Sequence, residues 1–178
     1  MHFELLYFII QAQSVPRLRM LCRVGKSCVR AASANASANV TPSVNVTMAD
    51  HGVAIMALNG PPVNTLNAQL LGDIKSSIDS LVADKASAIV LTSQKPGVFS
   101  SGLDIFSMYD KQEDDLRAYW EKVQDMWLSV YCCPVPIIAA INGAAPAGGC
   151  QIAMSCDYRI MADHPKPSWK IMTLKYDP

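Results

Sequence analysis

The spacing of apolar residues predicts where strands and helices form along this chain. Residues 44–48 and 53–58 are apolar-rich segments of strand length, and the Asp50 and Gly52 between them suit a hairpin turn. Three later apolar segments also have strand length, at residues 88–92, 136–141 and 158–161, and segment 136–141 is typical of a buried strand. The pattern therefore predicts five strands.

Two longer segments place apolar residues at helical spacing. The stripe of the first consists of Leu66, Leu70, Ile74, Ile78 and Leu81. Asn64 or Thr65 is the candidate cap in front of it. The second segment, residues 114–131, has an aromatic face that favours core packing, although such a face could also line a pocket. With a third helix expected over residues 148–156, strands alternate with helices, which implies βαβ crossovers and an α/β fold.

Composition and charge narrow the class of protein. With 178 residues, 51% of them hydrophobic and 17% charged, the chain can bury one sizeable core, and its length favours a single domain. Formal net charge is zero, yet five of the 15 basic residues lie in the first 40 positions, where Glu4 is the only acid. Because the remainder is mildly acidic, we expect no nucleic-acid partner.

The basic leader, residues 1–40, is typical of a mitochondrial transit peptide. Residues 20–39 contain no acid and are rich in Ser and Ala, although an ordinary disordered tail would share this composition. Translation could start at Met1 or at Met20. The apolar segment 5–10 is too short to span a bilayer, so we expect no membrane span. The leader predicts a protein of the mitochondrial matrix.

The cysteines favour reduced thiols, which agrees with a matrix protein. Cys132 and Cys133 are adjacent, and Cys150 and Cys156 fall within one predicted helix. None of the cysteine spacings matches a metal-ligand pattern. We therefore expect neither disulfides nor a metal site.

Two glycine-containing stretches, residues 99–104 and 142–150, follow predicted strands and lead toward helices. At such places backbone N–H groups are left free, and glycine lets a ligand approach the main chain closely. Two such donors that converge on one oxygen would form an oxyanion hole, which favours chemistry on a carbonyl. Either stretch alone could instead serve only a turn or close helix packing.

Four short motifs along the chain form a specific combination. They are Pro61-Pro62-Val63-Asn64-Thr65-Leu66, Ser100-Ser101-Gly102-Leu103-Asp104, Asn142-Gly143 with Gly148-Gly149-Cys150, and Cys156-Asp157-Tyr158-Arg159. Together they resemble the crotonase (enoyl-CoA hydratase/isomerase) superfamily, and in detail they are similar to its mitochondrial 3-enoyl-CoA isomerases. The resemblance implies the N-terminal portion of a crotonase-like ββα spiral over residues 41–163, followed by a tail, residues 164–178, without likeness to the family.

The resemblance also implies a substrate and a set of site residues. The carbonyl oxygen of an acyl-CoA thioester would accept hydrogen bonds from the N–H groups of Leu103 and Gly148, the two catalytic positions. The remaining substrate-binding positions would be Ser100, Ser101, Gly102, Asp104 and Ala147. No separate cofactor is implied, because CoA is part of the substrate. A helix cap or an ion pair is the alternative role for Asp104.

Two departures from the family pattern bear on activity. Gln151 stands where the hydratases carry their first glutamate, and an amide cannot act as the base for water addition. The isomerases use one glutamate after the Cys-Asp-Tyr-Arg motif, whereas no glutamate follows Glu121 here, and the Pro-rich tail offers only His164 as a substitute base.

The resemblance and these departures define the expected function. By family, we expect isomerisation of 3-enoyl-CoA to trans-2-enoyl-CoA in mitochondrial fatty-acid β-oxidation. The alternative is a non-catalytic acyl-CoA-binding or interaction fragment, such as a splice form. The family forms homotrimers through C-terminal helices, which we expect to be missing from this chain.

Overall fold

The computed structural model describes residues 43–163, which form an α/β fold. The chain divides into two units between residues 40 and 41, and the described residues all belong to the second unit. The transit peptide predicted over residues 1–40 and the predicted tail, residues 164–178, lie outside the described residues.

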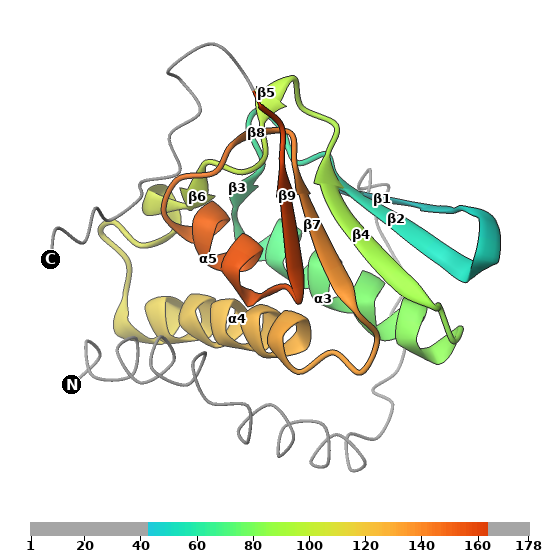
Figure 1. Cartoon of the computed structure of the whole chain (residues 1–178). Coiled ribbons are helices and arrows are strands. Elements are labelled where there is room, and N and C mark those ends of the chain that lie inside the picture. Colours follow the sequence, from blue (N-terminus) through green and yellow to red (C-terminus); the bar gives the residue numbers. More distant parts are fainter. Residues whose placement is uncertain (1–42, 164–178) are drawn as a thin grey trace, which may run out of the picture. The chain divides into compact units, whose positions relative to one another are not determined.

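Five strands form one sheet in the order β1-β2-β4-β7-β9 (Figure 1). Their bounds are Val44–Met48 for β1, Val53–Leu58 for β2, Ala88–Ser93 for β4, Ile137–Ile141 for β7 and Tyr158–Met161 for β9. β1 and β2 form an antiparallel hairpin around the short 3-10 helix η2, Asp50–Gly52, and the later neighbours are parallel. All five predicted strands are confirmed. Each crossover after β2 adds the next strand at the same edge of the sheet.

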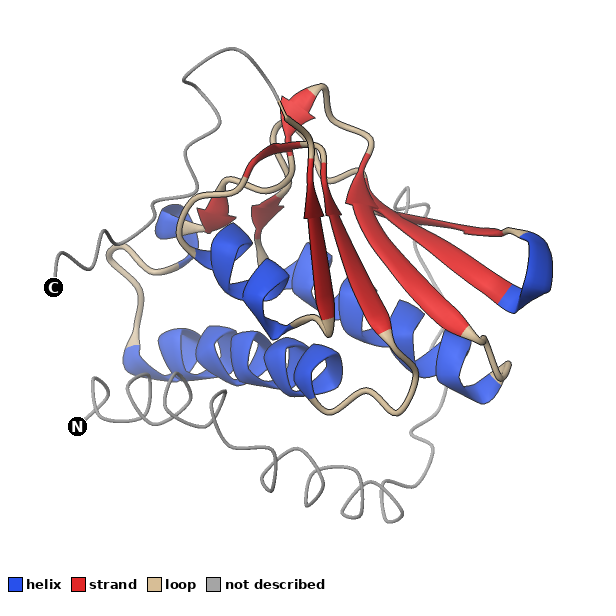
Figure 2. Ribbon diagram, in the orientation of Figure 1, coloured by secondary structure: helices blue, strands red, loops and turns tan. Residues whose placement is uncertain are grey.

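Three helices form the crossovers between the parallel strands (Figure 2). They are α3 Ala68–Ala83, α4 Glu113–Tyr131 and α5 Gly148–Ser155, and a 3-10 turn, η3 Ile105–Ser107, precedes α4. The predicted start of α3 at Asn64 or Thr65 is wrong. Asn67 caps this helix instead, because its side chain accepts a hydrogen bond from Leu70 N (2.9 Å).

Four two-residue strands join the loops at the ends of the long strands. β3 (Thr65–Leu66) pairs in parallel with β6 (Gly102–Leu103), and β5 (Gly97–Val98) pairs in parallel with β8 (Gly143–Ala144). The sequence pattern does not predict these strands, because two residues are too few to show a periodicity. The pairing of Thr65 and Leu66 with β6 is also the reason that α3 begins later than expected.

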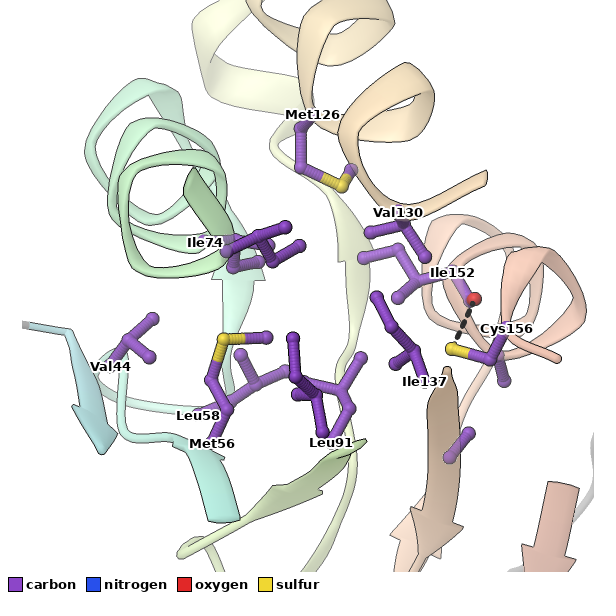
Figure 3. Packing of buried hydrophobic residues seen from close by; sticks show 14 of the residues in the cluster. Val44, Met56, Leu58, Ile74, Leu91, Met126, Val130, Ile137, Ile152 and Cys156 are labelled. Carbon is purple, nitrogen blue, oxygen red and sulfur yellow. Dashed lines mark hydrogen bonds between the residues drawn. The ribbon is translucent and has the colours of Figure 1, made fainter. Parts of the chain in front are cut away.

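The hydrophobic core lies between one face of the sheet and the helices. Figure 3 shows sheet residues such as Met56, Leu91 and Ile137 facing Ile74 of α3 and Met126 of α4. Within β4 and β7, fully buried residues alternate with partly exposed ones, as expected for a strand that is covered on one face. The described part of the sheet therefore packs helices against one face only.

Strand β9 differs from its neighbour β7 in exposure. Four positions of β9 are exposed, including Tyr158 at 63% and Ile160 at 57%, although β9 pairs with β7 along its length. Segment 136–141 was expected to be buried, and the strand within it, Ile137–Ile141, alternates between buried and half-buried positions. Burial within the described residues thus falls from β7 to β9.

Candidate active site

The two glycine loops lie side by side beyond the ends of β4 and β7. β5 and β8 bring them together, with Val98 opposite Ala144. The carbonyl oxygen of Ala144 accepts hydrogen bonds from both Phe99 N (2.9 Å) and Ser100 N (3.2 Å). A Cβ added to Gly143 would lie 2.2 Å from Val98 N, so glycine is required for this close pairing.

The two predicted catalytic positions lie next to each other. Gly148 is the first residue of α5, where N–H groups have no acceptor within the helix. A Cβ added to Gly148 would lie 3.2 Å from Leu103 N, and a Cβ added to Gly102 would lie 3.2 Å from Gly148 N. The main-chain nitrogens of Leu103 and Gly148 are therefore close together although they come from two different crossovers.

The start of α5 is held tightly against the first loop. A Cβ added to Gly149 would lie 2.6 Å from Ser100 O, so a side chain there would push the helix away from the loop. Ala147, the residue before α5, has φ +46° and ψ −116°, a left-handed conformation that residues other than glycine rarely adopt. Such strain persists only where the surrounding packing imposes it, which indicates a precisely constrained helix start.

Hydroxyl groups hold the first loop in place. Ser100 is fully buried, and its Oγ donates to Asn64 O (2.8 Å) and accepts from Gly102 N (3.2 Å). Ser101 Oγ lies 2.9 Å from Thr65 Oγ1, within hydrogen-bond distance. The Ser100 side chain thus positions the main chain of the loop from inside the protein, whereas the half-buried Ser101 lies nearer to the surface.

Asn64 links the Pro-rich turn to the first loop, and it is not among the predicted site residues. Its Nδ2 donates to Ser93 Oγ (2.7 Å) and to Phe99 O (2.9 Å), and its side chain is fully buried. Its Oδ1 has no hydrogen-bond partner within residues 43–163. The partners of Asn64 are 29 and 35 positions away, so local sequence patterns give no signal for this role.

Two acidic residues that follow the glycine motifs, Asp104 and Asp157, have structural roles. Asp104 caps η3, because Oδ1 accepts from Phe106 N (3.1 Å) and Oδ2 accepts from Ser107 Oγ (2.6 Å). The capping alternative for Asp104 is thus confirmed. Asp157 Oδ2 accepts from Ile137 N (2.9 Å) and joins the start of β9 to the start of β7.

Tyr119 of α4 contacts the site through its hydroxyl group. Tyr119 Oη donates to Leu66 O (2.8 Å) and accepts from Asp104 N (3.0 Å). Removal of the phenol from water raises the pKa of Tyr119 above its ordinary value. The aromatic face of α4 packs in the core, as the sequence favours, but the sequence gives no indication of these two hydrogen bonds.

The two residues directly after Gly149 are uncharged. Burial raises the pKa of the Cys150 thiol, which keeps this group neutral near pH 7, and Gln151 is a half-buried amide. Among residues 43–163, the four cysteines form no disulfide. Across residues 43–163 no cluster of His, Cys, Asp or Glu is arranged to hold a metal ion.

The helices of the described segment are too short or too polar to cross a membrane.

Comparison with known proteins places this chain in a family. The chain matches the family described as enoyl-CoA hydratase/isomerase over residues 48–175, which is more than half of its length. The chain therefore belongs to the enoyl-CoA hydratase/isomerase family, the crotonase superfamily that its motifs resemble.

Individual members of the family are similar to this chain over part of their length. The chain is 47% identical over 116 residues to enoyl-CoA delta isomerase 1, mitochondrial, of Mus musculus, covering 65% of this chain and 40% of the relative. The human protein of the same name is 45% identical, with 65% and 38% covered. The chain thus spans about 40% of the length of these curated relatives.

Solved structures are similar over the same region. The crystal structure of human mitochondrial delta3-delta2-enoyl-CoA isomerase matches with a TM-score of 0.66 and 44% identity, over 69% of this chain and 48% of that one. Pseudomonas aeruginosa DspI matches with a TM-score of 0.63 and 30% identity, over 70% and 51% of the two chains. The similarity to the human isomerase confirms the crotonase-like α/β fold that the sequence predicts.

Proposed function

We propose that this chain serves as an enoyl-CoA delta isomerase, which converts a 3-enoyl-CoA to a trans-2-enoyl-CoA in mitochondrial fatty-acid β-oxidation. The names of the mouse and human relatives support both the reaction and the compartment, and the expected transit peptide supports the mitochondrial matrix. The substrate would be an acyl-CoA thioester, and no separate cofactor is expected.

One observation carries this proposal: the main-chain nitrogens of Leu103 and Gly148 lie close together where the two glycine loops meet. Gly148 begins α5, so the helix dipole and the first N–H groups favour negative charge at this point. Two donors aimed at one oxygen form the arrangement that stabilises a thioester enolate.

The proposed chemistry begins with removal of a proton from C2 of the 3-enoyl thioester. The electron pair of that bond moves toward the carbonyl, and negative charge collects on the thioester oxygen as a dienolate forms. The N–H groups of Leu103 and Gly148 would stabilise that charge, and loss of one such donor typically raises the barrier by about 3 kcal/mol. Return of the proton at C4 then leaves the double bond between C2 and C3.

The proton must be carried from C2 to C4 by a general base. Gln151 cannot serve, and the carboxylates of Asp104 and Asp157 accept hydrogen bonds that hold η3 and β7 in place. The amide of Gln151 also favours isomerase over hydratase chemistry, because it occupies the position of a hydratase glutamate.

The same observation supports a second candidate function, a non-catalytic acyl-CoA-binding or interaction role. In that role the two glycine loops would bind the thioester without completing proton transfer. No glutamate follows Glu121 in the sequence, which is the specific observation in its favour. Binding experiments test the feature that both candidates share, and turnover separates them.

A matched pair of glycine variants tests the shared feature. Gly148→Ala would place a Cβ 2.9 Å from Leu66 Cδ1 and 3.2 Å from Leu103 N, whereas Gly72→Ala places its Cβ in open space on α3. Calorimetry would compare a 3-enoyl-CoA with its thioether analogue, which lacks the carbonyl. We expect the parent and Gly72→Ala to prefer the thioester about fivefold, the equivalent of one hydrogen bond of ~1 kcal/mol. Gly148→Ala should lose that preference.

Equal affinity of the parent for the thioester and the thioether would contradict the oxyanion hole. Turnover of 3-enoyl-CoA by the parent, followed from the absorbance of the conjugated product, would favour the isomerase over the binding role.

A further inference from the structure

The hydroxyl group of Tyr119 contacts main-chain groups next to Leu103, the first proposed oxyanion donor. Tyr119 is 4% exposed on α4, and its Oη contacts Leu66 O (2.8 Å) and Asp104 N (3.0 Å). These two main-chain groups lie 53 and 15 positions away along the chain. The hydroxyl therefore bridges the end of β3 and the residue that follows β6.

The direction of both hydrogen bonds is fixed by chemistry. A carbonyl oxygen can only accept and an amide N–H can only donate, so the single phenolic proton of Tyr119 is used on Leu66 O. A lone pair of the same oxygen then accepts the N–H of Asp104. Because burial raises the pKa of Tyr119, the phenol keeps this proton throughout the neutral range.

Both partners of Tyr119 adjoin Leu103. Leu66 is the residue paired with Leu103 across β3 and β6, and Asp104 N belongs to the peptide that follows Leu103. On the other side, Gly102 N is held by the buried Ser100 Oγ (3.2 Å). Two hydroxyl groups thus fix the Ser101–Gly102 peptide and the Leu103–Asp104 peptide. The Gly102–Leu103 peptide, which carries the N–H of Leu103, lies between these two fixed peptides.

We propose that Tyr119 is a positioning residue that orients the N–H of Leu103 toward the thioester oxygen. The inference rests on the proposed function of that N–H, and it adds a residue from a separate helix to the site. The hydroxyl group is the part that matters, because a phenylalanine would fill the same space in the core but would satisfy neither main-chain group.

A chromophoric ligand reports the orientation directly. In 4-(dimethylamino)cinnamoyl-CoA, electron density shifts from the amine toward the thioester carbonyl on excitation, so hydrogen bonds to that oxygen move the absorbance to longer wavelength. The full chain would be titrated with this ligand, giving both a dissociation constant and the size of the red shift. Melting temperature would be followed in parallel.

The matched variants are Tyr119→Phe and Tyr109→Phe, since Tyr109 is 78% exposed. We expect the parent and Tyr109→Phe to show the same red shift. Tyr119→Phe should show less than half of that shift with a dissociation constant within about threefold of the parent, because most of the ligand contacts remain. A full red shift in a folded Tyr119→Phe variant would overturn the inference.

The outcomes separate this inference from the proposed function. Absence of a red shift in the parent would contradict the oxyanion hole itself, whereas a parent shift that survives in Tyr119→Phe would contradict only the role of Tyr119. If Tyr119→Phe does not fold, 3,5-difluorotyrosine at position 119 keeps the ring and lowers the phenol pKa. The red shift should then decrease as pH rises and this phenol loses its proton, and a shift independent of pH would overturn the inference.

Discussion

The two loops that meet at the candidate site are built in opposite ways. The first loop, taken here together with β5 as residues 97–104, is held by side chains. Ser100 and Tyr119 satisfy its main-chain groups from inside the protein. The second loop, residues 142–149, is held by the absence of side chains, because a Cβ at Gly143 or Gly149 would strike the main chain of the first loop. We therefore expect the first loop to be destabilised when a side-chain hydroxyl is removed, and the second loop when a side chain is added to one of its glycines.

This difference explains how a short region can present two main-chain donors together. Hydroxyl groups fix the peptide planes around Leu103, and bare glycines let α5 approach until Gly148 N lies beside them. Both devices position main chain, and neither brings a proton-transfer group to the site. The loops would thus stabilise an anion without creating one.

The largest expected effect concerns this missing proton-transfer group. A positioned general base typically contributes about 10² to 10⁴ in rate. Because no glutamate follows Glu121 and Gln151 is an amide, we expect the 178-residue chain to isomerise 3-enoyl-CoA slower than mouse enoyl-CoA delta isomerase 1 by about that factor. Steady-state assays of the two proteins side by side would check this, and comparable rates would show that another group, such as His164, acts as the base.

The next effect tests the loop that depends on glycine. Gly149→Ala would place a Cβ 2.6 Å from Ser100 O. Because the Cβ is fixed to the main chain of α5 and Ser100 O belongs to the main chain of the loop, neither can move aside easily. We expect a loss of about 3 kcal/mol in the free energy of unfolding, at the upper end for overpacking. Urea denaturation would measure it, with Gly72→Ala as the control.

In the control variant the added methyl group meets open space within a helix, so a small gain of about 0.5–1 kcal/mol is expected. Similar stabilities for the two variants would contradict the tight approach of α5 to the first loop.

A smaller effect tests the loop that depends on side chains. Ser100→Ala removes the partner of Asn64 O and of Gly102 N at a fully buried position. Leaving such groups unsatisfied should lower the free energy of unfolding by about 2 kcal/mol. Ser76→Ala is the control, because the Ser76 hydroxyl contacts only an exposed carbonyl of its own helix. Chemical denaturation of both variants would show whether Ser100 has the larger role.

The smallest effect is a pH dependence from Tyr119. Its folded-state pKa is raised above the ordinary tyrosine value, chiefly by burial, so the folded protein holds this proton more tightly than the unfolded chain does. The protonated phenol of Tyr119 therefore contributes stability to the folded protein. This contribution is fully present below pH ~10, the ordinary tyrosine pKa, and it is lost as pH rises through the raised pKa of the folded protein. The melting temperature, measured between pH 8 and pH 11, should fall more steeply with pH for the parent than for Tyr119→Phe. Equal slopes for the two proteins would contradict this assignment.

Much of the fold could be predicted from the sequence because its long elements carry local patterns. The strands Val44–Met48 and Val53–Leu58 have their predicted bounds, since both are apolar-rich segments of strand length and a turn signal separates them. The start of α3 was misplaced because Thr65 and Leu66 are drawn into β3 by a partner strand far along the chain. A two-residue strand is set by tertiary pairing and leaves no local trace.

The candidate site divides in the same way. The family resemblance pointed to Leu103 and Gly148, and the structure brings their main-chain nitrogens close together. Their action on a thioester oxygen stays a prediction. Asn64 and Tyr119 were missed as contributors because their partners lie tens of positions away in the sequence. Ser100 is among the predicted substrate-binding positions, yet it is fully buried and its hydroxyl contacts Asn64 O and Gly102 N.

Infrared spectroscopy of a bound thioester tests the central claim, that the N–H groups of Leu103 and Gly148 act together on one carbonyl oxygen. A 3-enoyl-CoA labelled with ¹³C at the thioester carbon would be bound to the chain, and its carbonyl stretch would be isolated by subtracting the unlabelled spectrum. Two preorganised donors weaken the C=O bond, so the account predicts a stretch at lower wavenumber than in water, and a return toward the free value in Gly148→Ala. A bound thioester whose carbonyl stretch equals that of the free ligand in water would contradict it.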